Sequence, residues 1–312
     1  MDLRPQGHEI IRTWLFSSIV RARAELGDLP WHTVQLNGWI LDPDRKKMSK
    51  SFSKASTPVD QVERYGSDAI RYWAANGRSG VDIAFDENQI RIGRRLSTKL
   101  LNASRFVLGL GAISPLGGMV ASPVDRSMLA TLSTVVDEAT AAMESYDHTG
   151  AIEAVERFFW AFCDDYIELV KERAYGSGEA SGSARAALAL ALSVQLRLFA
   201  PFLPYVTEEI WSWWQPGSIH RAAWPTVGEL AESAGDPAVL NVVSEALHQV
   251  RRAKSERRLS MKAEVSMAEV LGPAPVLDQL AAAAADLRAA GRITTLDLRL
   301  GRTDDLTVAC AF

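Results

Sequence analysis

Apolar positions recur every three or four residues over most of this chain, which is the pattern of helices that each bury one face. After a Gly- and Pro-rich linker at 109–123, the pattern predicts helices over 125–146, 151–174, 184–200 and 205–214, with a flexible loop at 176–183. The aromatic positions of the second helix fall on one face, so we expect a packed core there rather than a platform for stacking bases. That face holds Val155, Phe159, Phe162, Tyr166 and Leu169.

The two ends of the chain combine helical periodicity with shorter alternating runs. A helix opens at Gly7-His8-Glu9, and residues 31–41 read as a strand that turns at 42–44. Near the other end the pattern predicts a helix over 239–258, a strand over 264–271, a helix over 275–290 and strands over 293–300 and 306–312. The predicted fold class is therefore mainly α with α/β portions.

A helix predicted over 60–73 is followed by a second one from about residue 86, and the second has two distinct faces. Apolar residues such as Leu96 and Leu100 recur on one face, and the opposite face is basic. A solvated stripe is the commonest fate of such charges. The basic face holds Arg91, Arg95, Thr98, Asn102 and Arg105.

Composition limits the kinds of protein that this chain can be, but it does not identify a function. The 312 residues are 47% hydrophobic and 23% charged, with a net charge of -4, so RNA binding would depend on local basic patches rather than on overall charge. The two cysteines, Cys163 and Cys310, support neither a disulfide framework nor a cysteine-rich zinc site, and we expect no metal site. Because no long apolar run or signal-peptide pattern occurs, we expect a cytoplasmic protein without a membrane segment.

One short stretch carries candidate chemistry, namely Lys47-Met48-Ser49-Lys50-Ser51. Two lysines three positions apart can neutralise charge that develops on phosphate oxygens, most strongly when they are held in place beforehand. No Gly-rich phosphate loop is present, so side chains would hold a polyphosphate. The alternative is an exposed, solvated basic loop.

This pentapeptide is identical to the KMSKS motif of class I aminoacyl-tRNA synthetases, and the chain resembles that family over nearly its whole length. The runs at 4–14 and 65–73 are similar to the valine branch of the family. The isoleucine branch is a lesser alternative, and the run at 4–14 speaks against it. The runs at 159–168 and 198–211 resemble its anticodon-binding helical bundle. After the pentapeptide, Phe52-Ser53-Lys54 stands where the family usually has Lys-Gly-Asn, which changes how that loop can turn.

The resemblance implies roles for single residues. Lys47 and Lys50 would act on the ATP phosphates, Glu9 and Gly7 would hold the ribose, and Trp14 would wall the amino-acid pocket. A helix N-terminal charge for Glu9 and a core position for Trp14 remain alternatives. Met48, Ser49 and Ser51 would complete the ATP site, and the expected tRNA contacts are Arg91, Arg95, Arg105, Arg251 and Arg252.

The second catalytic motif of the class, His-Ile-Gly-His, does not occur in this sequence. We therefore expect the C-terminal part of an enzyme that attaches valine to its tRNA with ATP and Mg²⁺, inactive by itself and monomeric. The expected division is 1–52 for the end of the nucleotide-binding fold, 53–108 for a junction, 109–232 for the anticodon bundle and 233–312 for a small α/β domain. A non-catalytic tRNA-binding paralogue or remnant of a class I synthetase is the alternative.

Overall fold

A computed structural model describes residues 2–42, 44–47, 58–111, 119–231, 235–301 and 305–312. The chain forms two compact units, each assembled from separate stretches of sequence. The first unit contains Met1–Leu101, Ala139–Glu153 and Phe199–His220, and the second contains Asn102–Glu138, Ala154–Leu198 and Arg221–Phe312. The fourfold division along the sequence stays a prediction.

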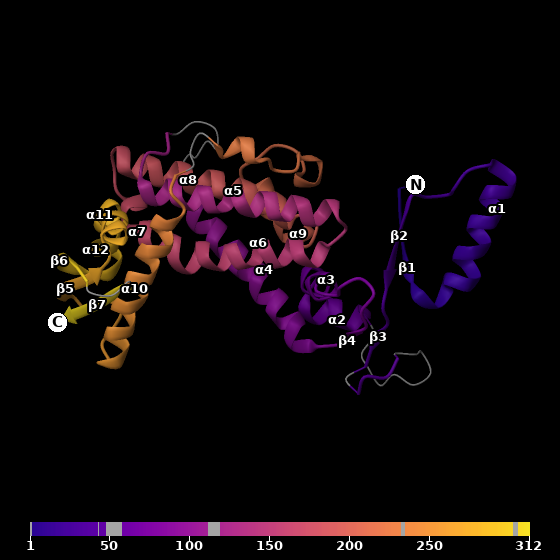
Figure 1. The fold of residues 1–312 in the computed structure, drawn as a ribbon, viewed down its shortest axis with the longest axis horizontal. Coiled ribbons are helices and arrows are strands. Elements are labelled where there is room, and N and C mark those ends of the chain that lie inside the picture. The colour runs from indigo at the N-terminus through magenta and orange to yellow at the C-terminus, as the bar shows by residue number, and fades with distance from the viewer. Residues whose placement is uncertain (1, 43, 48–57, 112–118, 232–234, 302–304) are drawn as a thin grey trace. The chain divides into compact units, whose positions relative to one another are not determined.

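The first unit begins with a β-α-β arrangement (Figure 1). Strands β1 (Leu3–Gly7) and β2 (Thr33–Asn37) run parallel. The connection between them holds η1 (His8–Ile10), the π-helical η2 (Ile11–Leu15) and α1 (Phe16–Leu26), and none of the residues of α1 is buried. The helix predicted from Gly7 is thus three successive segments, which end at Gly27 with a φ of 72°.

The strand predicted over 31–41 is two short strands, which are separated by Gly38 and Trp39 and pair with different partners. Strand β3 (Ile40–Leu41) pairs in parallel with β4 (Ile83–Ala84), and the N–H of Ile83 donates to the carbonyl of Trp39 over 2.9 Å. A Cβ on Gly38 would lie 2.2 Å from the carbonyl oxygen of Val81, so only glycine permits this approach. The close pairing fixes Trp39 beside the end of β2.

Gly66 divides the helix that periodicity predicts over 60–73. Helix α2 (Pro58–Tyr65) ends there and α3 (Ser67–Ala75) begins, because Gly66 has a φ of 86° that a helix cannot contain. The carboxylate of Asp68 then accepts the N–H groups of Tyr205 and Val206 over 3.1 and 2.7 Å, which caps α9 (Pro204–Ser212). A side chain from α3 therefore fixes the start of α9 within the first unit.

The helical part follows the predicted pattern with two differences. The helix expected over 151–174 contains a π-helical turn, and the loop expected at 176–183 is shorter because α8 begins at Glu179. The predicted core face is confirmed, since Val155, Phe159 and Tyr166 are buried. The elements are α4 (Glu87–Leu108), α5 (Pro123–Glu144), α6 (His148–Ala161), η3 (Phe162–Tyr166), α7 (Ile167–Tyr175), α8 (Glu179–Phe199), η4 (Ile219–Arg221) and η5 (Val227–Glu229).

The last part of the chain is a three-stranded sheet with helices, as predicted. Helix α10 (Ala238–Glu256) precedes strands β5 (Val265–Gly272), β6 (Ile293–Leu300) and β7 (Thr307–Ala311) in the order β6-β5-β7. Strand β5 runs parallel to β6 and antiparallel to β7. The single helix predicted over 275–290 is two, α11 (Ala274–Ala282) and α12 (Ala284–Gly291), because Ala283 leaves helical geometry.

A buried ionic cluster holds the second unit together. Arg173 on α7 makes two hydrogen bonds of 2.8 Å to Asp125 on α5, and two of 2.8 and 3.1 Å to Asp286 on α12. Asp125 also accepts the hydroxyls of Tyr166 and Ser183 over 2.8 and 2.6 Å. Helices that are far apart in sequence are thereby joined by charge-assisted hydrogen bonds.

The predicted fold class, mainly α with α/β portions, is confirmed. Among the helices in the described part of the chain, none is both long enough and apolar enough to cross a membrane.

Candidate functional site

Glu9, Trp39 and Lys47 meet at one exposed point of the first unit. The indole Nε1–H of Trp39 donates to Oε2 of Glu9 over 2.9 Å, and Nζ of Lys47 lies 3.5 Å from Oε1. The same ammonium group lies 4.3 Å from the centre of the Trp39 ring. The Glu9 and Lys47 side chains are 41% and 50% exposed, so this cluster remains accessible to a ligand.

Local structure brings together Glu9, which follows β1, and Lys47, which lies beyond β3. Glu9 follows β1 directly, and Gly7 leaves room for it, since a Cβ there would lie 2.6 Å from Oε2 of Glu9. Asp42 folds the turn before Lys47, because its carboxylate accepts the N–H of Lys46 over 2.8 Å. An isolated bridge then pairs Lys47 with Leu41.

The environment of Glu9 favours its charged form. The pKa of Glu9 is lowered, first by a hydrogen bond from its own backbone, next by the Trp39 indole, and further by Lys47. Glu9 is therefore a carboxylate near neutral pH and can accept hydrogen bonds from ligand hydroxyls. Of the predicted ATP-site residues, Met48, Ser49, Lys50 and Ser51 lie outside the described residues.

Trp14 belongs to a second cluster in the same unit. Its ring stacks on Trp31 with centroids 5.7 Å apart, and the guanidinium of Arg4 lies 3.9 Å from the Trp14 ring centre. Trp14 is 41% exposed, which leaves it available to a ligand. The role of Trp14 in an amino-acid pocket stays a prediction.

Sequence reasoning missed Arg4, Gln6 and Trp39. Gln6 is only 6% exposed, yet its carboxamide has no hydrogen-bond partner among the described residues, and the Nε of Arg4 has none either. Alternation along β1 places Arg4 and Gln6 on the same face. The sequence feature that could have indicated this polar face is the presence of two polar residues at positions i and i+2 of the strand.

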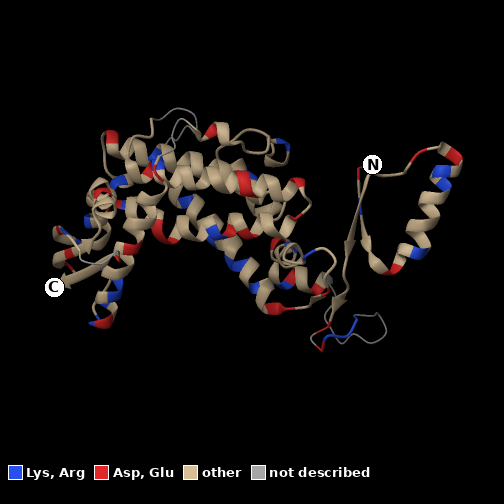
Figure 2. Cartoon of the chain, viewed as in Figure 1, with Lys and Arg blue, Asp and Glu red and all other residues tan. Residues whose placement is uncertain are grey.

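The basic face predicted on α4 is present. Arg91, Arg95 and Arg105 are exposed, while Leu96 and Leu100 opposite them are fully buried. Figure 2 shows basic residues along α4. Arg91 forms an ion pair of 3.2 Å with Glu87, one turn earlier. Contact with tRNA remains a prediction for all three arginines.

The two arginines predicted on α10 differ in their surroundings. Arg251 donates to the backbone carbonyl of Asp164 over 3.4 Å and lies 3.7 Å from the carboxylate of Glu168. Arg252 is exposed and lies 3.7 Å from Glu256. Since exposed pairs of this length contribute little, Arg252 keeps most of its capacity to bind an anion. Both tRNA contacts stay predictions.

Two family models match most of the chain. Residues 1–86 match the family described as tRNA synthetases class I (I, L, M and V), and residues 125–270 match the anticodon-binding domain of tRNA ligase. The chain therefore belongs to the class I tRNA synthetases.

Within that class the chain belongs with the valine–tRNA ligases. It is 58% identical over 301 residues to the valine–tRNA ligase of Thermobifida fusca, an alignment that covers 95% of this chain and 34% of the relative. The corresponding enzyme of Leifsonia xyli is 52% identical over 314 residues, covering 99% of this chain and 36% of the relative. The chain thus spans about a third of the length of these relatives.

A solved structure supports the fold. The LeuRS of Agrobacterium radiobacter K84, in a ternary complex with tRNA and LeuAMS, matches with a TM-score of 0.57 and 22% identity. The match covers 73% of this chain and 29% of that one. At this identity the likeness concerns the fold alone.

Proposed function

We propose that this chain is the C-terminal part of a valine–tRNA ligase, and that it supplies the KMSKS loop and binds the anticodon arm of valine tRNA. The complete enzyme would join valine to ATP, release pyrophosphate and pass the valyl group to the terminal adenosine of the tRNA. We further propose a cytoplasmic monomer. The contact between Glu9 and Lys47 carries the proposal, because it places a carboxylate and the first lysine of the motif at one accessible point.

Each residue of this point has a role in the proposed reaction. Glu9 would accept hydrogen bonds from the ribose hydroxyls, with Gly7 leaving room for its carboxylate. Lys47, together with Lys50, would stabilise negative charge on the triphosphate while the α-phosphate is attacked. The indole of Trp39 would hold Glu9 in position.

Mg²⁺ would enter with ATP in this proposal. Among the described residues no group of three or more His, Cys, Asp or Glu side chains could hold a metal ion. A magnesium ion bound chiefly through phosphate oxygens and water fits such a surface, because Mg²⁺ commonly keeps several waters and uses few protein ligands. When bound, the ion would neutralise phosphate charge.

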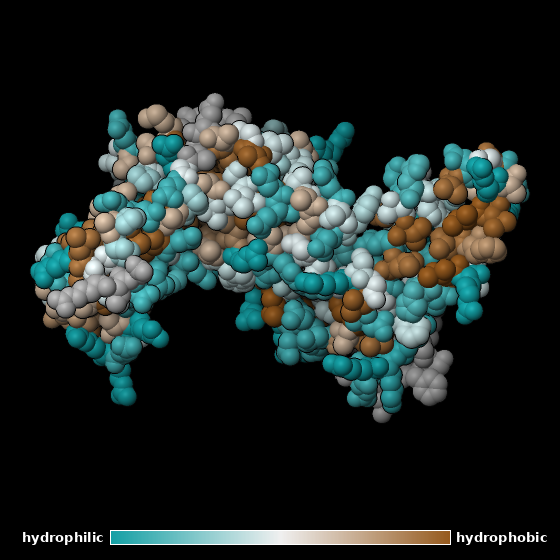
Figure 3. Space-filling view, in the orientation of Figure 1, coloured by the Kyte–Doolittle hydropathy of each residue, from teal (hydrophilic) through white to brown (hydrophobic). Residues whose placement is uncertain are grey.

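We propose that the chain does not form aminoacyl adenylate by itself. The sequence contains no His-Ile-Gly-His motif. Helix α1 exposes large apolar side chains, among them Phe16, Val20 and Leu26, and Figure 3 shows apolar residues gathered over this helix. Apolar patches of this kind commonly mark interaction surfaces. The remainder of a nucleotide-binding fold would cover it.

The alternative is a non-catalytic tRNA-binding paralogue or remnant. The absent His-Ile-Gly-His motif favours this alternative. The arrangement of Lys47 against Glu9 favours the enzyme, because binding RNA alone requires neither residue to be held against the other.

Two measurements test the proposal. Binding of the chain to valine and isoleucine tRNA transcripts across a salt series should reveal a preference for the valine transcript, and equal weak binding would favour the remnant. Joining the chain to the first two thirds of the Thermobifida fusca relative should give ATP–pyrophosphate exchange.

The joined enzyme also tests the role of the motif loop. The double variant Lys47→Ala, Lys50→Ala should sharply lower the exchange rate and leave the affinity for tRNA almost unchanged. An unaltered exchange rate would refute the role of the loop.

A further inference from the structure

A pocket of the second unit, here called the alanine pocket, has small apolar walls. Its volume is about 530 Å³, and it lies among the residues before α5, the start of α8 and the junction of α11 with α12. Short side chains leave space between these segments, so the walls can contact an aliphatic chain. The small residues that line it are Ala121, Ala180, Gly182, Ala282, Ala283 and Ala285.

Three polar residues form the floor of the alanine pocket. Asp286 and Ser183 are only 6% and 1% exposed, and the side chain of Arg173 is 14% exposed. All three belong to the buried ionic cluster that joins α5, α7 and α12. The pocket therefore combines apolar walls with a charged, largely buried end.

The side-chain donors of this floor are already used. Arg173 has five N–H groups, and all five donate: four to Asp125 and Asp286, and one to the carbonyl of Ala180 over 2.9 Å. The hydroxyl of Ser183 donates to Asp125. A ligand group that accepts hydrogen bonds would find no free side-chain donor on the floor.

Asp286, in contrast, keeps capacity to accept hydrogen bonds. A carboxylate can accept about four of them. Asp125 accepts four, two from Arg173 and one each from Tyr166 and Ser183. Asp286 accepts only two from the described residues, both from Arg173. The floor of the alanine pocket thus suits a ligand group that donates hydrogen bonds.

Charge makes a cation the favoured donor. The two carboxylates of the cluster, Asp125 and Asp286, face one guanidinium, that of Arg173. Burial raises the pKa of Asp286 although Arg173 acts in the opposite direction, so the arginine compensates this charge incompletely. Glu179, which is exposed, also lines the pocket and adds a further negative charge.

The helix ends at the alanine pocket do not turn it into an anion site. Asp125, Glu179 and Asp286 each lie in the first turn of a helix, namely α5, α8 and α12. A helix N-terminus carries about half a positive charge, whereas each acid carries a full negative one. Each of these helix ends is therefore neutralised by its own acid.

A metal ion fits the alanine pocket less well than an organic cation. Ions such as Ca²⁺ take several oxygen ligands, and among the described residues no group of three or more His, Cys, Asp or Glu side chains could hold a metal ion. An ammonium group needs fewer partners, and a chain attached to it can contact the alanines.

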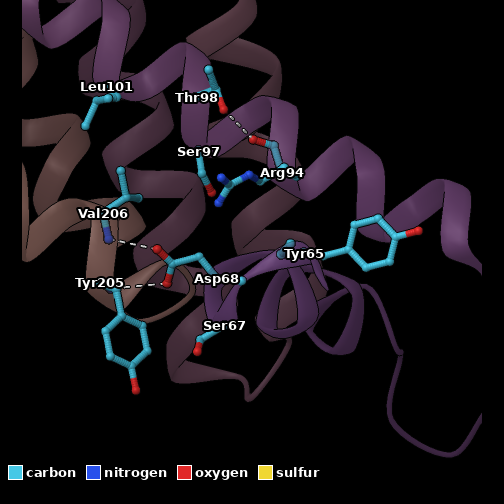
Figure 4. A pocket seen from close by; sticks show the side chains of 11 residues that line it. Tyr65, Ser67, Asp68, Arg94, Ser97, Thr98, Leu101, Tyr205 and Val206 are labelled. Carbon is cyan, nitrogen blue, oxygen red and sulfur yellow. Dashed lines mark hydrogen bonds between the residues drawn. The ribbon is translucent and has the colours of Figure 1, made fainter. Parts of the chain in front are cut away.

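A hollow of the first unit shows that a buried carboxylate in a pocket is not sufficient. Figure 4 shows Asp68 and Arg94 among the side chains that line this hollow, with the oxygens of Asp68 accepting the N–H groups of Tyr205 and Val206. An ammonium group there would also lie near an exposed guanidinium. The alanine pocket differs because its one guanidinium is held between two carboxylates.

We propose that the alanine pocket binds an aliphatic diamine, with one ammonium group at Asp286, the alkyl chain along the alanines and the second ammonium group near Glu179. The inference goes beyond the proposed function, since it uses none of the residues assigned there to ATP, valine or tRNA. An amino acid would bind poorly, because its carboxylate would lie near Asp286 or Glu179.

Isothermal titration calorimetry of the whole chain with cadaverine tests the proposal, with pentanediol as the uncharged analogue. We expect saturable binding of cadaverine and none of the diol. Asp286→Asn should weaken cadaverine binding at least about tenfold, the scale of one charge-assisted hydrogen bond. Glu179→Gln should weaken it only about twofold to fivefold, because an exposed ion pair contributes less.

A matched pair of variants leaves the ionic cluster intact. Ala282 and Ala281 are neighbouring exposed residues of α11, and only Ala282 lines the pocket. Ala282→Leu should fill part of the pocket and weaken cadaverine binding, whereas Ala281→Leu should leave the affinity unchanged. Equal affinities of these two variants, equal binding of cadaverine and pentanediol, or an unchanged affinity in Asp286→Asn would each overturn the assignment.

Discussion

The indole N–H of Trp39 donates to the carboxylate of Glu9 across 30 positions of sequence. This contact joins the segment between β2 and β3 to the first helical segment, η1. Lys47 is bound to the same carboxylate, so one side chain connects the motif loop with the strand end where a nucleotide would lie. The position of the Glu9 carboxylate is therefore determined by Trp39 at one oxygen and Lys47 at the other.

Replacing Trp39 with Phe should raise the pKa of Glu9. The change removes the indole donor and keeps an aromatic ring beside Lys47, so the carboxylate loses one of the hydrogen bonds that lower its pKa. A carboxyl NMR titration of Glu9 measures this shift. Trp213→Phe, which removes an indole donor from Glu209 instead, should leave the titration of Glu9 unaltered.

The direction of the accompanying stability change follows from the lowered pKa. A carboxylate whose pKa is lower in the folded chain stabilises it above its unfolded pKa, and this contribution is lost as the pH falls through the folded value. Trp39→Phe should therefore be slightly less stable than the wild type near neutral pH, with the difference vanishing in acid. A difference that grows in acid would contradict this account.

Replacing Arg173 with Met should destabilise the chain by about 3–5 kcal/mol, because it leaves Asp125 and Asp286 buried without their partner. The Arg173 side chain is 14% exposed, so water cannot compensate for the loss. Denaturant unfolding measures the effect. Arg157→Met, which breaks an exposed pair of 3.4 Å with Glu138, should cost at most about 1 kcal/mol, and equal losses would show that burial is not decisive.

Replacing Gln6 with Leu should raise the free energy of unfolding by about 1 kcal/mol. The buried carboxamide of Gln6 has lost water without gaining a hydrogen bond from the described residues, a cost that leucine avoids. Urea titration measures the change. Gln35→Leu should act in the opposite direction, because Gln35 donates to the hydroxyl of Ser79 over 2.7 Å. A loss of stability in Gln6→Leu would mean that the carboxamide has a partner in solution.

The periodicity of apolar residues predicts those features of the fold that depend on the spacing of nearby residues. The buried face of Val155 and Phe159 and the three strands near the end of the chain follow from three- and four-residue spacing or from alternation. The strand order β6-β5-β7, in which β5 pairs with both of the other strands, cannot be predicted from the residue pattern of any single strand.

Contacts between distant residues explain most of what periodicity misses. Asp125, Arg173 and Asp286 occupy three separate helices, and no local pattern indicates that they form one cluster. Trp39 reads as an ordinary apolar position of a strand, although it is the hydrogen-bond partner of Glu9. Such pairs depend on how elements pack, which is decided after their local conformations.

Gly66 separates α2 from α3, a division that the pattern of apolar residues does not predict, and its replacement tests this division. Replacing it with Ala should cost about 1–2 kcal/mol, because its φ of 86° disfavours any residue with a Cβ. The new methyl group would also lie 3.1 Å from the guanidinium of Arg94, which must then shift.

Gly182 is the matched control, since it lies exposed inside α8 and a methyl group added there would meet no atom within 4 Å apart from its chain neighbours and the nearby backbone of its own helix. Gly182→Ala should stabilise the chain by about 0.4–1 kcal/mol, because alanine has the higher helix propensity and a less flexible unfolded state. Thermal and denaturant unfolding of both variants measure the pair. Equal stability of Gly66→Ala and Gly182→Ala would contradict this account. It would indicate that α2 and α3 can join as the continuous helix that periodicity predicts. Asp68 would then lose the geometry with which it caps α9.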